Sequence, residues 1–547
     1  MSFQPRIRDY LLVASAAVLV IVPVIIYGVP NASADLLHHL QISRAFYDCW
    51  LQGTFLPNWV INENAGYGAV TVRFYPPLMH ASLAFSRLVF GTWNFAVFAV
   101  FSAWSIIGCV GIYLFARDLG IDGLRSAASA VLFGLAPYHL NQFYNSAMYG
   151  EFAALSLLPF CFLFAGRVCD RSGIANVIGL AVSFALLVLS NLPQTVVGAV
   201  GVGIFIVLKL DRETLRSQLL RLSAAGVLAL TASSFYWLRV VREMSWINIS
   251  LPNTDPLYDY RNHFLLTSLQ FDDSGVWFAS LFFLLIIVVL AIAVAASGTA
   301  RTMWHGKLRP VSILMFFSVV MMLPLSKFIW DNIEILQKVQ FPWRFLSVAA
   351  IASSLLLGNC LGFLTIENFR KQRPFVLLIV GAIAIAATFS IKQVALGAVF
   401  IEPQLFDRMV SNSGPKKGLW HWHPIWFEDR AMKQTTKVVA GSRDVTITGW
   451  ETETREFSVA SGDTVDARIA LLYYPHWTAS INGRRAEVLP VPDGAVLIPL
   501  PAEEAHVRLM FDEPVSTLIA RQVSVWTWIG MVIALLLGKT IGRRELK

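Results

Sequence analysis

The sequence has little cysteine and little charge for its length. Only five of the 547 residues are cysteines, and charged residues make up 14% of the chain. The cysteines at 49, 109, 161, 169 and 360 show neither metal-ligand spacing nor the density of a disulfide framework. The chain also lacks a Walker phosphate loop, a dinucleotide-binding fingerprint and a Gly-x-Ser-x-Gly elbow. These absences leave nucleotide-driven transport without support.

Apolar residues, in contrast, are abundant. They make up 56% of the chain, more than the core of a soluble protein of this length would bury. A membrane-spanning helix needs about 20 apolar residues, and stretches of roughly that length recur along the sequence. The predicted spans are 10–28, 92–115, 126–140, 152–166, 173–190, 195–208, 223–240, 276–296, 311–325, 346–365, 375–391 and 519–538. The sequence therefore predicts a polytopic α-helical membrane protein with about 12 transmembrane helices, the first being a retained anchor.

The net charge of +8 is spread over short loops and does not lie on one face, so no nucleic-acid partner is expected. If Arg6 and Arg8 are cytoplasmic, every second loop is also basic, which is the positive-inside pattern. These loops contain Arg117 and Arg125, Arg167 and Arg171, Lys209 to Arg221, Arg301 to Arg309, Arg370 to Arg373, and Lys539 to Lys547. The pattern predicts a multi-pass protein of the bacterial cytoplasmic (inner) membrane with both termini in the cytoplasm.

The segments left outside the membrane differ in kind. Residues 1–391 are predicted to form the transmembrane core, with external loops at 29–90, 141–151, 242–276 and 326–345, the last an amphipathic helix in the interface. Residues 392–518 show short alternating runs that predict strands at 444–448, 455–459, 467–473, 495–499 and 507–511. The turn signals Asn482-Gly483 and Asp493-Gly494 support hairpins, so an extracytoplasmic β-sandwich is expected. Residues 519–547 would form the final helix and a basic tail.

Two carboxylates are candidates for chemistry. His38 and His39 follow Asp35 by one helical turn, so a carboxylate and an imidazole can share a face suited to taking a proton from a hydroxyl. Alternatively, Ser33 or Asp35 caps the start of a helix running through Leu36 to Trp50. Glu151 begins an apolar span, where an ionised group is costly, and there it either acts in function or complements the helix dipole.

Other polar residues near these positions are candidate ligands for substrate. Tyr149 precedes Glu151, and Asn191 and Gln194 interrupt the apolar stretch between two spans. Arg73 and Arg344 could each bind a phosphate, although an arginine near a bilayer often contacts lipid headgroups instead.

Several motifs resemble those of a known family. An Asp follows the first span; Trp50, Gly53, Pro57 and Trp59 match W-x-x-G-x-x-x-P-x-W, Gly66 and Gly68 match G-x-G, and residues 74–78 read FYPPL, which includes Tyr75. Further matches are SNLPQ at 190–194, with Asn191 where the family tends to have His, QFPWRFL at 340–346 and YYPHWTASINGRR at 473–485. The chain resembles the YfhO-like and 6-pyruvoyl-tetrahydropterin-synthase-related bacterial membrane proteins, which look like fold-C (GT-C) glycosyltransferases.

The resemblance implies transfer of a sugar from a polyprenyl-phosphate-linked donor to an envelope glycan, lipid or protein acceptor outside the cytoplasm. Asp35 would be the general base of an inverting reaction, Glu151 a second catalytic carboxylate, and Arg73, Arg344 or Arg261 would stabilise the leaving lipid phosphate. His38, His39, Tyr75, Tyr149, Asn191 and Gln194 would bind substrate.

Two alternatives remain open at this stage. One is a flippase or transporter of lipid-linked glycans, although no inverted repeat is visible. The other is a scaffold subunit that keeps the fold without activity. No cofactor is predicted, and a divalent metal between Asp35, His39 and Glu151 is left open. Membrane lipids are expected partners in every case.

Overall fold

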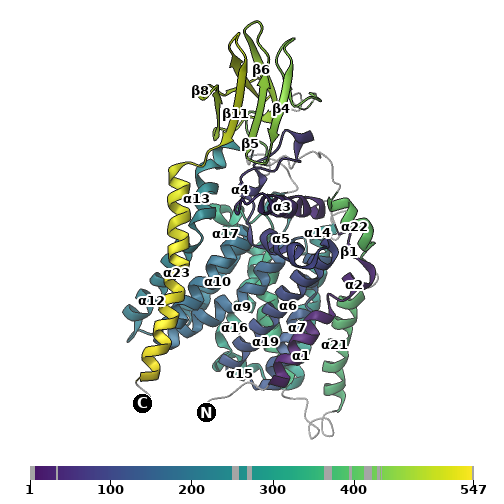
Figure 1. Cartoon of the computed structure of the whole chain (residues 1–547). Helices are drawn as coiled ribbons and strands as arrows, with labels where there is room; N and C mark the ends of the chain where they lie inside the picture. Colours follow the sequence, from purple (N-terminus) through teal and green to yellow (C-terminus); the bar gives the residue numbers. More distant parts are fainter. Residues whose placement is uncertain are drawn as a thin grey trace.

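The computed structural model describes residues 7–32, 35–248, 258–267, 274–361, 373–392, 397–411, 422–427, 432 and 434–544. A helical bundle forms the larger part, and a β-sandwich stands at one end of it (Figure 1). Short helices lie between the two parts, among them α3 (Asp35–Leu51) and α4 (Thr71–Phe74).

Each of the twelve apolar stretches predicted from the sequence overlaps a helix. The first half of the bundle has α1 (Ile7–Leu19), α2 (Pro23–Tyr27), α5 (Leu78–Phe90), α6 (Trp93–Asp118), α7 (Gly123–Gly134), α8 (Pro137–Tyr144), α9 (Tyr149–Asp170), α10 (Ile174–Ser190) and α11 (Leu192–Val207). The second half has α12 (Leu215–Ala232), α13 (Ser234–Glu243), α14 (Ser274–Ser297), α15 (Ala300–His305), α16 (Arg309–Met322), α19 (Leu346–Cys360), α21 (Arg373–Lys392) and α23 (Val515–Arg544).

The number of membrane crossings depends on how bent helices are counted. In the described part of the chain, six helices are long and apolar enough to span a bilayer, and eight if two bent pairs each count as one span. The pairs bend by 71° between α12 and α13 and by 85° after α16. Helices α5, α10 and α11 are apolar but shorter. The prediction of about 12 spans is therefore not confirmed.

Local sequence signals explain several helix ends. Thr92 and Asp122 cap α6 and α7 by accepting hydrogen bonds from Phe95 N and Arg125 N. Pro137 starts α8, because proline has no N–H to donate to the preceding turn. The predicted span 126–140 is consequently two helices, α7 and α8. The predicted interfacial helix at 326–345 is likewise a series of short helices, α17 (Lys327–Asn332), α18 (Glu334–Gln337) and the 3-10 helix η7 (Pro342–Phe345).

The predicted β-sandwich is present as two antiparallel sheets. One has the strand order β3-β6-β10-β9 and the other β4-β5-β11-β7-β8. Their bounds are β3 (Val438–Val439), β4 (Val445–Trp450), β5 (Thr454–Val459), β6 (Val465–Leu472), β7 (Trp477–Ile481), β8 (Arg484–Ala486), β9 (Leu489–Pro490), β10 (Ala495–Leu500) and β11 (Ala505–Phe511). All five strands expected from the alternating pattern exist, and the Asn482-Gly483 turn joins β7 to β8 with positive φ at both residues.

The boundary of the sandwich differs from the predicted residue 392. Its first strand begins at Val438. The preceding β2 (Phe400–Ile401) pairs with β1 (Val29–Pro30), and α22 (Pro403–Ser411) packs on the bundle, where Asp407 accepts a hydrogen bond from Trp93 N at the start of α6. Residues 397–411 therefore belong to the helical part, because amphipathic α22 buries Phe406 and Val410 against it.

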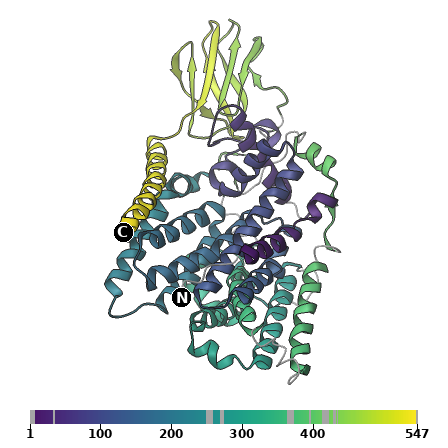
Figure 2. The same cartoon turned by 60° about the horizontal axis from the view of Figure 1, so that its bottom comes forward.

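The sandwich and the bundle share a hydrophobic core. Inward-facing sandwich residues such as Phe457 and Ile498 belong to the same buried cluster as Trp59, Phe74 and Tyr236 from the end of the bundle next to the sandwich. Helix α23 then leads from the sandwich along the outside of the bundle to its far end, where α1 also starts (Figure 1). Figure 2 shows α23 and α21 at opposite edges of the bundle. The two described chain ends thus lie on the side away from the sandwich (Figure 1).

Candidate functional site

Three of the predicted site residues meet in a buried cluster of the bundle. Glu151, in the first turn of α9, accepts hydrogen bonds from Tyr138 (2.5 Å) and from Gln194 Nε2 (2.8 Å). Arg344 of η7 forms an ion pair with it, with Nε 3.2 Å from Oε2. The Glu151 side chain is 2% exposed and that of Arg344 is 6% exposed. Burial of the pair is tolerated only because each charge has a partner and hydrogen bonds.

A polar cavity of about 180 Å³ opens beside this ion pair. Its wall combines the ion pair with amide, hydroxyl and aromatic side chains: Tyr138, Asn141, Gln142, Asn145, Ser146, Met148, Phe278, Ala279, Phe282, Phe341 and Trp343. A single water needs only about 15 Å³ of such space, so the cavity can take a larger polar group. Amides and aromatic faces in one wall suit hydroxyl groups on an apolar ring.

Arg344 keeps part of its hydrogen-bonding capacity at this cavity. Of its five N–H groups, three are used, by Glu151, the Val339 carbonyl and Gln340. Its guanidinium also lies over the ring of Phe341, 4.8 Å from the centroid. Within the described residues, two N–H groups on Nη2 remain for an anion, and binding of a phosphate by Arg344 stays a prediction.

The first turns of α3 form a second side of the site. Asp35 is the first residue of α3, so the helix expected from Asp35 to Trp50 exists. His39, one turn later, is stacked between the rings of Tyr149 (centroids 5.1 Å apart) and His80 (5.3 Å). Burial, together with the neighbouring His80 and His38, lowers the pKa of His39, while a hydrogen bond with the backbone of Ala147 opposes this. His39 is therefore neutral at pH 7 and acts as a hydrogen-bonding and stacking group.

Tyr75 connects the two sides. Its ring lies edge-on to His39 (5.4 Å) and His80 (5.1 Å). The pKa of its phenol is raised by burial, by the charge of Asp35 and less by that of Glu151, with Arg344 acting in the opposite direction. Asp35, Glu151 and Arg344 therefore all act electrostatically on this phenol. The predicted residues Asp35, His38, His39, Tyr75, Tyr149, Glu151, Gln194 and Arg344 thus form one region.

Asn191 and Gln194 are close to this region but have supporting contacts. The Asn191 side chain caps α11 by accepting a hydrogen bond from Gln194 N at 2.9 Å. Gln194 is 0% exposed and lies between Glu151 and Ser347, whose hydroxyl donates to Gln194 Oε1 at 3.0 Å. The structure therefore gives Asn191 a capping role and makes Gln194 a residue that orients Glu151, where the sequence predicted substrate contacts.

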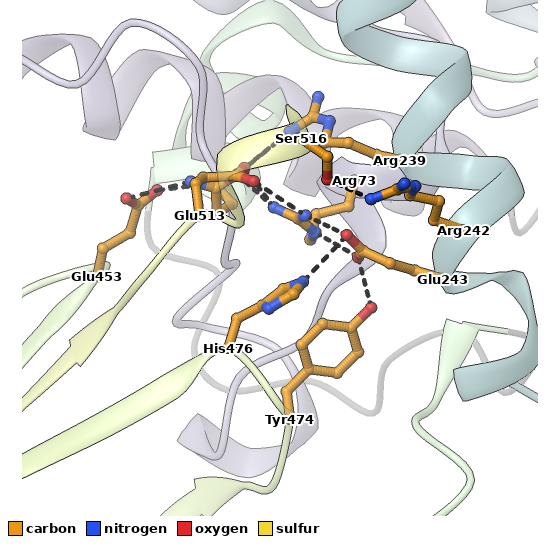
Figure 3. A network of polar contacts seen from close by, with 10 residues as sticks. Arg73, Arg239, Arg242, Glu243, Glu453, Tyr474, His476, Glu513 and Ser516 are labelled. Carbon is orange, nitrogen blue, oxygen red and sulfur yellow. Dashed lines mark hydrogen bonds and ion pairs between the residues drawn. The ribbon is translucent and has the colours of Figure 1, made fainter. Parts of the chain in front are cut away.

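Arg73 is not part of this group. All five of its N–H groups donate to Glu243, Glu513 and Asn58, and its side chain is 0% exposed (Figure 3). Because no N–H group is left for a ligand, the geometry argues against the predicted phosphate contact. Arg261 lies elsewhere, more than half exposed beside Asp259 and Asp331.

A second, apolar cavity of about 190 Å³ is lined by the next turns of α14. Phe278 and Phe282 of α14 line the polar cavity, whereas Leu285, Ile286 and Val289 line the apolar one. These positions follow one face of the helix, where successive residues rise by about 1.5 Å. The rest of the apolar wall comes from α7, α19 and α21. The two cavities therefore lie one after the other along the same face of α14.

The alternative of a shared metal gains no support from the geometry. Among the described residues, no three His, Cys, Asp or Glu side chains converge as metal ligands would. This includes Asp35, His39 and Glu151.

The sequence analysis did not single out several residues of the site. Tyr138, Asn141 and Gln142 lie on α8, which the predicted span 126–140 partly absorbed. Pro137 was the available signal, because a proline seldom continues a helix. His80 carried no signal, since its contact with Ser43 (Oγ to Nδ1, 3.0 Å) joins residues 37 positions apart.

A comparison with family models identifies the family of this chain. The model described as the 6-pyruvoyl-tetrahydropterin synthase related domain, a membrane-protein family, matches residues 72–394, more than half of the chain. The chain belongs to this family. The matched range holds Tyr75, Glu151, Gln194 and Arg344 but begins after Asp35. No curated protein matches the sequence.

Solved structures with a similar fold include three proteins. The arabinofuranosyltransferase AftD from Mycobacteria has a TM-score of 0.48 at 16% identity over 71% of this chain and 27% of its own. ArnT from Cupriavidus metallidurans, bound to undecaprenyl phosphate, has a TM-score of 0.43 at 15% identity over 69% and 63%. The oligosaccharyltransferase AglB from Archaeoglobus fulgidus has a TM-score of 0.41 at 13% identity over 75% and 56%. The chain thus spans about a quarter of the length of AftD and less than two thirds of the other two.

Proposed function

We propose that this protein is an inverting glycosyltransferase that moves a sugar from a polyprenyl-phosphate-linked donor to an acceptor hydroxyl outside the cytoplasm. The observation that supports it most is the pair of cavities along one face of α14, one with polar side chains in its wall and one apolar. A lipid-linked sugar has the same division, with an apolar chain, a phosphate and a polyhydroxylated ring in sequence. The prenyl chain would lie against Leu285, Ile286 and Val289, and the sugar among the amides of α8.

The two uncommitted N–H groups of Arg344 would bind the phosphate that joins lipid and sugar. Glu151 fixes the guanidinium from the other side, and Gln194 and Tyr138 fix Glu151. A preorganised cation of this kind stabilises the charge that develops on a leaving phosphate. Glu151 is thus a residue that positions Arg344, and its carboxylate also stands where it can accept a hydrogen bond from a sugar hydroxyl.

Asp35 would act as the general base, as the family resemblance implies. Its carboxylate takes the proton of an acceptor hydroxyl, and the acceptor oxygen forms a bond to the anomeric carbon. The bond from this carbon to the phosphate oxygen breaks, and the lipid phosphate leaves with the electron pair. Attack opposite the leaving group inverts the configuration. Neutral His39 and Tyr75 line this face and would orient the acceptor.

The test is transfer of radiolabelled sugar in proteoliposomes that contain polyprenyl-phosphate sugars and envelope acceptors. Wild type would be compared with Asp35→Asn and with Asp48→Asn, a control on the same helix whose carboxylate pairs with Arg44 at 3.3 Å. We expect transfer to fall by about 10²-fold or more in Asp35→Asn and to persist in the control.

Transfer that is equal in wild type and Asp35→Asn would remove Asp35 from the mechanism. No transfer with any donor, while labelled lipid still crosses the bilayer, would favour the flippase alternative. Neither activity in a folded protein would favour the scaffold alternative.

A further inference from the structure

A buried polar network joins the β-sandwich to the helical bundle (Figure 3). It contains Arg73 of α4, Glu243 of α13, Tyr474 and His476 before β7, and Glu513 in the link between β11 and α23. The candidate site does not use these residues directly. These residues lie between the β-sandwich and the helical bundle.

The network is fully hydrogen-bonded at its centre. Both oxygens of Glu243 accept from Arg73, at 2.8 Å from Nε and 2.5 Å from Nη2. The same carboxylate accepts from Tyr474 OH at 2.7 Å, and His476 Nε2 lies 3.1 Å from it. Four contacts use the whole acceptor capacity of a carboxylate, just as five use the donors of Arg73. Such an arrangement fixes direction as well as distance, whereas apolar packing alone allows the surfaces to slide.

Arg73 also binds Glu513 and Asn58 through its Nη1. Its Nη1 lies 2.6 Å from both Glu513 Oε1 and Asn58 Oδ1, and Arg239 also approaches Glu513 at 3.6 Å. Since Glu513 stands between the last sandwich strand and α23, the network holds the sandwich both at β7 and at its exit.

Arg73 is also two residues from Tyr75 of the candidate site. The short helix α4 is held on each side of Arg73: Thr71 donates to Glu63 at 2.8 Å, and Tyr236 donates to the Phe74 carbonyl at 2.7 Å. The chain then turns directly to Tyr75, whose ring rests on His39 and His80. A displacement of Arg73 therefore moves the segment that carries Tyr75.

We propose that Arg73 and Glu243 are positioning residues. They couple the orientation of the β-sandwich on the helical bundle to the position of Tyr75 in the candidate site. Through them the sandwich helps to set the geometry of the acceptor face. This deepens the proposed function and rests on it for its catalytic consequence, while the coupling itself is a structural property that can be measured without any activity.

The test uses the full-length chain in proteoliposomes with Tyr75→Cys as a reporter. Because all five native cysteines are buried and position 75 is partly exposed, the introduced thiol is the one a maleimide reaches first. The reporter is combined with Tyr474→Phe, which removes one hydroxyl donor to Glu243, or with the control Thr478→Val. Thr478 lies on β7 and donates at 2.6 Å to Asp512, which follows β11. The control therefore removes a comparable hydroxyl-to-carboxylate bond outside the network.

We expect Tyr474→Phe to change the rate at which the introduced thiol is labelled by about fivefold or more, and the control to leave it unchanged. Glu513→Gln keeps the shape of the side chain and should act like Tyr474→Phe, which provides a second network variant should the first fail to fold. Equal rates in all folded variants, or an equal change in the control, would overturn the coupling.

A second readout separates positioning from a merely structural role. In the transfer assay, Tyr474→Phe in the otherwise native chain should lower kcat and leave KM for the lipid donor unchanged. The reason is that no residue of the network lines either of the two cavities along α14. A change in KM alone would contradict the assignment to the acceptor face. Absence of transfer in wild type would count against the proposed function only, since the labelling result stands by itself.

Discussion

Replacing Arg344 by methionine is the perturbation that tests the site most directly. The change keeps an apolar stem of similar length but leaves Glu151 without its cation. The two side chains are 6% and 2% exposed, with 3.2 Å between Nε and Oε2. Coulomb's law at this distance gives about 5 kcal/mol with an effective dielectric constant of about 20.

The net loss should be smaller, because Glu151 keeps its hydrogen bonds from Tyr138 and Gln194. Removing one partner of a buried ion pair usually costs about 3 to 5 kcal/mol, so we expect a loss near 3 kcal/mol in the free energy of unfolding. That is about a hundredfold change in the ratio of folded to unfolded protein. The double variant with Glu151→Gln should lose less than the sum of the single variants, by about 2 kcal/mol.

The measurement is reversible unfolding in mixed micelles, followed by tryptophan fluorescence. Arg508→Met is the control: its Nε lies 3.0 Å from Glu456, a similar separation, but the two side chains are 56% and 40% exposed. An exposed pair should cost less than about 1 kcal/mol. Equal losses for the buried and the exposed pair, or additive losses in the double variant, would refute the argument that burial makes this ion pair strong.

Three further predictions concern other parts of the molecule. Burial raises the pKa of Glu63 to about 7, although a hydrogen bond from Thr71 acts in the opposite direction. The folded protein therefore keeps a proton on Glu63 that the unfolded chain loses near pH 4.5. Stability should therefore fall by roughly 2 to 3 kcal/mol as the pH rises from about 4.5 to 7, and Glu63→Gln should remove this slope in pH-dependent unfolding. Gly358→Ala should destabilise the α7–α19 contact by about 1 to 3 kcal/mol in the same assay, because its Cβ would stand 1.8 Å from a serine oxygen of α7. The control Gly226→Ala places its Cβ in open space and should leave stability unchanged. Val289→Trp should fill the apolar cavity and weaken binding of a polyprenyl phosphate by about tenfold or more in a lipid-binding titration, while Val288→Trp, 52% exposed on the same helix, should bind as wild type.

The fold was largely predictable because its signals are local. Apolar length predicted a helix at each of the twelve stretches, and alternation with two hairpin turns predicted five of the sandwich strands. The α7–α8 break was also readable, at Pro137. The count of crossings was not, since α12 and α16 continue into strongly bent neighbours and bends of 71° and 85° leave no clear trace in hydropathy.

The site was predictable only in part because its contacts are distant in sequence. Polar residues that are costly near apolar stretches directed attention to Glu151, Gln194 and Arg344, and the structure brings these three together across 43 and 193 positions. The same reasoning failed for Arg73, whose partners lie 170 and 440 positions away and saturate it. Asn191 could have been read correctly, because an Asn before a helix that has Pro at its second position is a capping pattern.

Burial of a charge is therefore not enough to identify a functional arginine in this protein. Arg73 and Arg344 are both costly to bury, and both form ion pairs with a glutamate. They differ in what remains: Arg73 donates all five N–H groups to protein acceptors, whereas Arg344 uses three and lines a cavity of about 180 Å³. A saturated arginine fixes structure, and an unsaturated one beside a cavity has capacity for a ligand. If this distinction holds, Arg344→Lys should weaken phosphate binding while Arg73→Lys changes the position of Tyr75 and leaves phosphate binding intact; the reverse pattern in a titration with polyprenyl phosphate would show that hydrogen-bond saturation does not separate the two roles.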